Sequence, residues 1–150
     1  MVKRSASILL MAVLAVFALS TAAQAHCEIP CGIYDDSMRI DMLREHATTM
    51  EKAMKRIKKL NPQNAKENNQ LVRWISNKEE HAEKFQEIVN QYFLTQRIHL
   101  NTEKYTKKVT LLHHMLVYAM RCKQSLDMDN IKKLRSLIDS FEEVYFEGDE

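Results

Sequence analysis

Glycine and proline are scarce in this chain, which has only two of each among its 150 residues. These residues interrupt helices more often than any others, so a chain with so few of them is expected to form long helices. Pro30 and Gly32 lie close together near the N-terminus, which leaves Pro62 as the one proline and Gly148 as the one glycine elsewhere. The sequence therefore predicts an all-α protein.

Apolar residues recur at helical spacing in four segments. These begin near residues 37, 64, 101–102 and 127–129, and their apolar stripes end near residues 60, 93, 122 and 145. Asp36 or Ser37 can cap the first helix, Asn101-Thr102 the third, and Asp127 or Asp129 the fourth. The second segment is expected to bury one side made of Leu71, Trp74, Ile75, Ala82, Phe85, Ile88, Val89 and Tyr92. Short joints between such helices predict an antiparallel four-helix bundle over residues 37–146.

The first 25 residues predict an export leader. Lys3 and Arg4 precede an apolar run of twelve residues from Ile8 to Leu19, and Ala23-Gln24-Ala25 matches a signal-peptidase site. The run is shorter than the ~20 apolar residues that span a membrane. We therefore expect cleavage after Ala25, export to the periplasm or outside the cell, and no stable membrane anchoring afterwards. A retained anchor helix is the alternative.

Removal of the leader changes the charge balance. The leader holds two of the 22 basic residues and none of the 20 acidic ones, so residues 26–150 are formally neutral. A neutral chain without a basic tract gives no electrostatic basis for binding nucleic acid. Its length is that of one domain.

Two common chemistries of helix bundles lack their sequence signatures. A di-iron carboxylate site needs Glu-x-x-His pairs, and none of the five histidines after His26 has glutamate three positions before it. The Cys-x-x-Cys-His pattern of covalent haem attachment is also absent from the sequence. His46 is instead expected to be a core histidine, and His113-His114 a surface or packing pair. Cys122 is expected to be a buried small apolar residue.

Cleavage after Ala25 would expose a segment rich in metal donors, His26 to Tyr34, which we call the hook. It reads His-Cys-Glu-Ile-Pro-Cys-Gly-Ile-Tyr. An α-amine, an imidazole, a backbone amide and two thiols then fall within six residues.

The two hook thiols have two chemical interpretations. On spacing alone, Cys27 and Cys31 of an exported protein favour a disulfide, although so small a loop removes little entropy from the unfolded chain. As metal ligands, the His26 amine and the Cys27 amide nitrogen and thiolate form adjacent chelate rings, and the Cys31 thiolate completes an N2S2 plane. Such a plane suits Ni(II) or Cu(II) better than tetrahedral Zn(II). The His26 imidazole can reach an axial position above it.

The hook resembles that of the nickel-dependent superoxide dismutase family. The shared pattern, His-Cys-x-x-Pro-Cys-Gly-x-Tyr, is met by His26, Cys27, Pro30, Cys31, Gly32 and Tyr34. The resemblance extends over residues 26–150. Gln91-Tyr92-Phe93 is similar to the second-helix stretch that supplies another tyrosine near the metal in this family. In some members a glutamate and an arginine support the axial histidine; Asp41 is the candidate for the glutamate, and no arginine aligns near Asn77.

The resemblance implies a specific reaction and assembly. Two superoxide radicals and two protons give dioxygen and hydrogen peroxide, with one nickel ion per subunit alternating between Ni(III) and Ni(II). It implies a homohexamer of right-handed four-helix bundles and a maturation protease. Some members are cytoplasmic and lose a short leader to a dedicated protease.

The resemblance also implies catalytic roles for four residues, of which the first three hold nickel: His26, Cys27, Cys31 and Tyr34. His26 gives its amine and axial imidazole, Cys27 its amide nitrogen and thiolate, and Cys31 the second thiolate. Tyr34 lines the approach and helps to order water or a small anion. Two other functions stay open: a non-catalytic metal-binding protein with the same hook, and a structural exported bundle with a Cys27–Cys31 disulfide.

Overall fold

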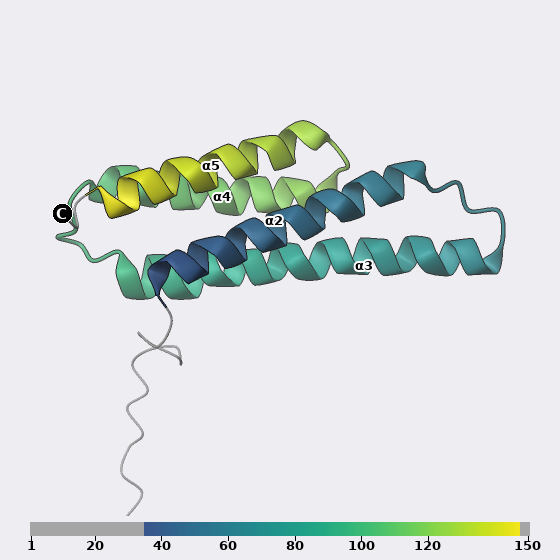
Figure 1. Ribbon diagram of the computed structural model, residues 1–150, viewed down its shortest axis with the longest axis horizontal. Helices are drawn as coiled ribbons and strands as arrows, with labels where there is room; N and C mark the ends of the chain where they lie inside the picture. The colour runs from purple at the N-terminus through teal and green to yellow at the C-terminus, as the bar shows by residue number, and fades with distance from the viewer. Residues whose placement is uncertain (1–34, 148–150) are drawn as a thin grey trace, which may run out of the picture.

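Four helical rods pack around one core in the computed structural model, which describes residues 35–147 (Figure 1). The elements are α2 (Asp36–Lys59), α3 (Ala65–Glu87), the π-helix η1 (Ile88–Arg97), α4 (Tyr105–Gln124) and α5 (Met128–Phe146). Successive rods run in opposite directions, and α2 contacts α3, α3 contacts α4, α4 contacts α5, and α5 contacts α2. The predicted all-α bundle is confirmed, whereas the predicted leader and hook, residues 1–34, lie outside the described residues. Within residues 35–147, no helix is long and apolar enough to cross a membrane.

Three of the four helix N-termini have a side-chain cap. Asp35, one residue before the predicted cap, accepts a hydrogen bond from Ser37 N (3.3 Å) and begins α2. Asn64 accepts from Glu67 N (3.0 Å), and Asp127 accepts from Asp129 N (3.0 Å) as predicted. Side-chain acceptors of this kind satisfy the free N–H groups of a first turn.

The predicted cap of the third helix is wrong. The Thr102 hydroxyl accepts from His99 N (2.9 Å), and the Thr102 carbonyl accepts from Tyr105 N (3.1 Å). Thr102 is therefore used to close the preceding turn. α4 begins three residues later, after Lys104, which adopts a left-handed backbone with φ of 55° and offers no side-chain cap.

The second rod continues four residues beyond its predicted end at Phe93, as the π-helix η1. Ile98 N donates to Phe93 O (2.9 Å), a step of five residues. This winding buries both Tyr92 and Phe93, which are 1% and 0% exposed. Short π segments within helices occur frequently at functional sites.

The core is apolar and aromatic, and it runs the length of the shorter α4–α5 pair. Its largest members come from every rod, among them Met50, Phe85, Phe93, Met115 and Phe141. Cys122 is fully buried as predicted, and this burial raises the pKa of its thiol to about 11. That thiol is therefore protonated at neutral pH.

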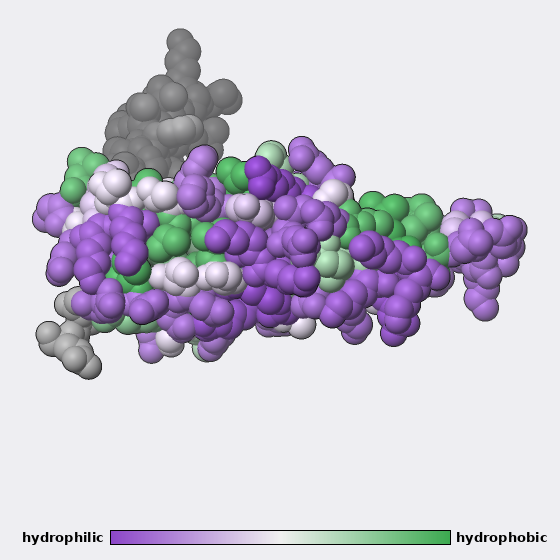
Figure 2. Space-filling view, turned by 90° about the horizontal axis from the view of Figure 1, so that it is seen from above, coloured by the Kyte–Doolittle hydropathy of each residue, from purple (hydrophilic) through white to green (hydrophobic). Residues whose placement is uncertain are grey.

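The first half of α3 is less buried than its apolar pattern predicts. Ile75 is 41% exposed, and Leu71 and Trp74 are half-buried. The reason is that α2 and α3 extend past the α4–α5 turn, so only α2 covers α3 there (Figure 1). Apolar surface is visible toward this end in Figure 2. The prediction of a buried Ile75 is therefore wrong.

His46 forms a contact that its place in the apolar stripe does not reveal. It is half-buried on α2, and its Nδ1 lies 3.0 Å from Nδ1 of His81 on α3. One ring must donate and the other accept, so at least one of the two nitrogens carries no proton. The pair is a cross-helix hydrogen bond that needs a neutral imidazole. His113 and His114 are exposed, which confirms a surface position.

We expect the free energy of unfolding to fall as the pH is lowered from about 7 toward 5. Burial, reinforced by His81 and Lys84, lowers the pKa of His46, and the opposing effect of Glu45 is smaller. The unfolded chain, in which histidine titrates near about 6.5, therefore binds more protons. This contribution is fully present above that value and is lost as the pH falls through the folded pKa.

Denaturant unfolding at several pH values measures the effect. His46→Gln should flatten the pH dependence between pH 7 and 5, whereas His113→Gln, at an exposed position, should leave it unchanged. An unaltered pH dependence in His46→Gln would contradict the role of His46.

Candidate metal centre

The hook joins the bundle at the N-terminus of α2. Tyr34 is its last residue, and the next one, Asp35, caps the helix. The predicted site residues His26, Cys27, Cys31 and Tyr34 lie outside the described residues. Five residue steps separate Cys31 from Asp36, and a chain spans at most about 3.6 Å per step. Covalent connectivity thus limits how far a hook ligand can be from the first turn of α2.

Four side chains from three elements meet at this turn, and we call them the Asp36 cluster: Asp36 of α2, Tyr92 and Arg97 of η1, and Tyr145 of α5. The Tyr92 hydroxyl donates to Asp36 Oδ1, and the Tyr145 hydroxyl donates to Oδ2 (2.7 Å). Arg97 Nη2 donates to the Tyr92 hydroxyl (2.8 Å). Arg97 Nε lies 3.0 Å from Asp36 Oδ1 as an ion pair that lacks hydrogen-bond geometry.

The environment of the Asp36 cluster keeps both phenols protonated. Burial raises the pKa of Tyr92, and its hydrogen bond to Asp36 raises it further, against a smaller opposite effect of Arg97. Burial and the bond to Asp36 likewise raise the pKa of Tyr145 well above its ordinary value. The hydrogen bond to Tyr92 raises the pKa of Arg97. At neutral pH the cluster therefore contains two phenol donors, one carboxylate and one guanidinium.

A second guanidinium lies against the same tyrosine. The Cζ atoms of Arg39 and Arg97 are 4.7 and 4.8 Å from the centre of the Tyr92 ring. Arg97 is paired with Asp36, whereas Arg39 Nε is buried and has no hydrogen-bond partner among residues 35–147. Two guanidinium groups thus flank Tyr92, and groups of this charge favour the approach of a small anion.

Metal donors do not gather elsewhere in the described part of the chain. No three His, Cys, Asp or Glu side chains within it could hold one metal ion. The ligands predicted from the sequence are those of the hook, and their chemistry fits nickel. Thiolates together with amine and amide nitrogens form a square-planar set, the geometry that Ni(II) favours.

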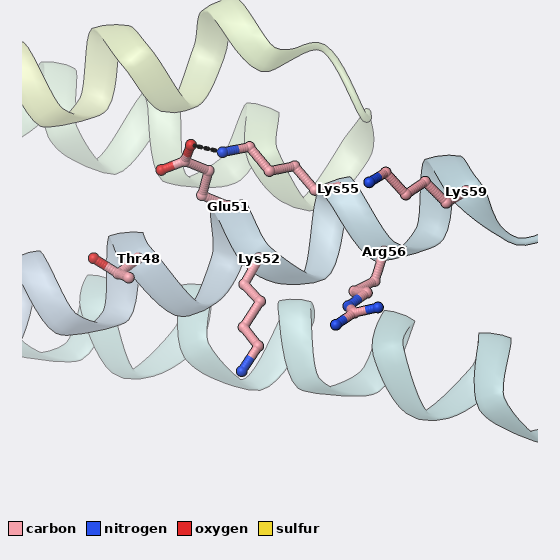
Figure 3. A pocket seen from close by; sticks show the side chains of 6 residues that line it. All are labelled: Thr48, Glu51, Lys52, Lys55, Arg56 and Lys59. Atoms are coloured by element: carbon pink, nitrogen blue, oxygen red, sulfur yellow. Dashed lines mark hydrogen bonds and ion pairs between the residues drawn. The ribbon is translucent and has the colours of Figure 1, made fainter.

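A broad surface hollow of about 400 Å³ lies on the C-terminal half of α2 (Figure 3). It is lined by Thr48, Glu51, Lys52, Lys55, Arg56 and Lys59. Glu51 accepts from Lys55 (2.5 Å) and from Arg135 of α5 (2.9 Å). At 1.5 Å of rise per residue, Glu51 is roughly 22 Å along the helix from Asp36. The hollow is therefore a salt-bridged surface that is separate from the Asp36 cluster.

A comparison with known families decides the identity. The sequence model of the nickel-containing superoxide dismutases matches residues 21–148, which include the hook and all of the described bundle. The chain belongs to this family. No curated protein and no solved structure matches it. This nickel superoxide dismutase is an oxidoreductase with a nickel cofactor and superoxide as its substrate. The family inferred from the hook is confirmed.

Sequence reasoning found only one member of the Asp36 cluster as a site residue. The family resemblance predicts Tyr92 near the metal, and Tyr92 is buried in the cluster. Asp36 stood out only as a possible cap and Tyr145 only as a member of an apolar stripe. A tyrosine in such a stripe needs a partner for its hydroxyl, and that signal could have identified Tyr145. Asp41, the candidate for the supporting glutamate, is exposed and pairs with Arg44 (3.5 Å).

Proposed function

We propose that this superoxide dismutase acts at a mononuclear Ni(II)/Ni(III) site built by its processed N-terminus. His26 would hold the nickel through its α-amine and imidazole, Cys27 through its amide nitrogen and thiolate, and Cys31 through its thiolate. The observation that carries the proposal is the family match, which begins before the hook and includes every donor in it. One nickel ion per subunit agrees with the family.

The bound nickel supplies the one-electron redox couple that dismutation needs. Anionic thiolate and amidate donors favour the higher oxidation state, and their hydrogen-bond partners tune it. Tyr34 lines the approach of superoxide and helps to order water or a small anion. The guanidinium of Arg39 beside Tyr92 attracts the anionic substrate toward this end.

We also infer how the precursor matures. The leader pattern in residues 1–25 supports export to the periplasm or outside the cell and cleavage after Ala25. The family resemblance supports a maturation protease and assembly into a homohexamer. A cytoplasmic chain whose leader is removed by a dedicated protease is the alternative.

His26→Ala separates the two donors of that residue. The variant keeps an α-amine, so nickel content should stay near one ion per chain, while turnover should fall by at least about tenfold because the imidazole donor is lost. The absorption and paramagnetic signals of Ni(III) should weaken in parallel. Dismutation at the wild-type rate would show that the imidazole is not a nickel ligand that catalysis needs.

The function itself is tested with the chain that begins at His26, loaded with nickel. Catalytic decay of superoxide, followed by its absorbance or by stopped flow, is the expected result. A carrier would bind nickel reversibly and show no turnover. A structural disulfide would show up as two fewer free thiols in the metal-free protein, with Cys27 and Cys31 unable to take up metal.

A further inference from the structure

We propose that Asp36 is a positioning residue for the dismutase: it fixes the point where the hook joins the bundle and orients the phenol of Tyr92. The inference rests on the proposed nickel site in the hook. It goes beyond that site because Asp36 lies in the bundle and is not among the proposed ligands.

The geometry of the carboxylate carries the proposal. An ionised carboxylate only accepts hydrogen bonds, so the protons of Tyr92 and Tyr145 both point at Asp36. The Tyr92 oxygen in turn accepts from Arg97 (2.8 Å). The Tyr92 hydroxyl therefore donates one hydrogen bond, to Asp36, and accepts one, from Arg97. These two bonds together fix the rotation of the hydroxyl about its C–O bond.

The position of Asp36 in the chain adds the second step. Asp36 is two residues after Tyr34 and is the first residue of α2, so its contacts hold the turn to which the hook is attached. Through Tyr92 and Arg97 it joins this turn to η1, and through Tyr145 it joins it to α5. Loss of the carboxylate would release the turn from both elements at once.

Helix packing alone does not require this cluster. Further along, Arg44 already joins α2 to α5 through Glu142 (2.5 Å) and Asp139 (3.1 Å). Arg135 makes a third such link through Glu51 (2.9 Å). The distinct contribution of Asp36 is therefore its contact with η1, beside the hook, where the stacked guanidinium of Arg39 also lies.

The charged groups that contact the two phenols come from α2, η1 and α4. Asp36 and Arg39 belong to α2, Arg97 to η1, and Lys108 of α4 lies 5.3 Å from the ring centre of Tyr145. Asp36 is the one carboxylate whose hydrogen bonds reach both phenols in the described residues. Its removal should therefore lower both tyrosine pKa values, since a carboxylate acceptor favours the protonated phenol.

The test compares Asp36→Asn with Glu51→Gln, a matched control that removes an α2–α5 carboxylate contact far from the hook. In the nickel-free protein, absorbance titration should show the most alkaline part of tyrosine ionisation moving to lower pH in Asp36→Asn only. In the loaded protein, nickel content should stay near one ion per chain, while kcat/KM falls about tenfold, as expected for a misplaced reactive group. The alkaline limb of the pH–activity profile should move to lower pH.

Tyr145→Phe keeps the ring packing and removes one hydrogen bond to Asp36. It tests the positioning role of Asp36 even if Asp36→Asn does not fold. It should lower kcat/KM by about threefold with full nickel content, since part of the positioning remains. Wild-type kcat/KM and an unmoved alkaline limb in the folded variant would overturn the inference, even with a shifted tyrosine titration. An inactive wild-type chain that begins at His26 would instead refute the proposed function.

Discussion

Cys27→Ser and Cys31→Ser are each expected to abolish nickel binding and dismutase activity while the bundle stays folded. A serine hydroxyl is a hard donor that stays protonated at neutral pH, so it does not replace a thiolate in the N2S2 plane. Loss of an indirect partner of a metal ligand already costs 10–100-fold, so activity should fall by more than about 100-fold. Elemental analysis and circular dichroism measure the two parts of the prediction.

Cys122→Ser is the matched control for both variants. The Cys122 thiol is fully buried and its pKa is raised to about 11, so it supplies no thiolate at neutral pH. This variant should keep its nickel and its rate, although its melting temperature will fall because a hydroxyl replaces a buried apolar group. Stoichiometric nickel in either hook variant, or loss of nickel in Cys122→Ser, would contradict the ligand assignment.

A single alanine added to the chain immediately before His26 is expected to reduce nickel binding and activity nearly to the level of the uncut precursor. In both proteins the His26 nitrogen is a peptide amide, which is a far weaker acid than the α-ammonium group, whose pKa is about 7.7–8.0. Metal binding needs deprotonated ligands, so the amine donor becomes available only after cleavage.

Three proteins make this comparison: the full precursor, residues 26–150, and the alanine-extended chain. All three have the same bundle and the same two hook thiols, so they differ only in what precedes His26. Nickel content and superoxide decay should be full in the second and low in the other two. Equal nickel and rate in the alanine-extended chain would show that the α-amine is not a ligand.

Much of the fold follows from local patterns in the sequence. The scarcity of glycine and proline, the helical spacing of apolar residues and the cap at Asp127 are local signals, and the structure agrees with them. The exposure of Ile75 was missed because it depends on the unequal lengths of the two helix pairs. The role of Thr102 was missed because a hydroxyl that caps a helix and one that closes a turn have the same sequence pattern.

The hook and the Asp36 cluster also differ in whether their residues lie close together in the sequence. The hook donors lie within six residues of one another, so the family resemblance can be recognised from the sequence, and the family match confirms the nickel dismutase. Asp36, Tyr92 and Tyr145 are separated by more than fifty residues at each step. A tertiary contact brings them together, and no periodic pattern encodes it.

Nickel content and N-terminal mass, determined on the same mature protein, test the central claim most directly. The account predicts one nickel ion per chain, on a chain whose first residue is His26. Nickel bound stoichiometrically to a chain that still carries residues before His26 would contradict it. So would a mature chain that begins at His26, has free thiols at Cys27 and Cys31, and binds no nickel.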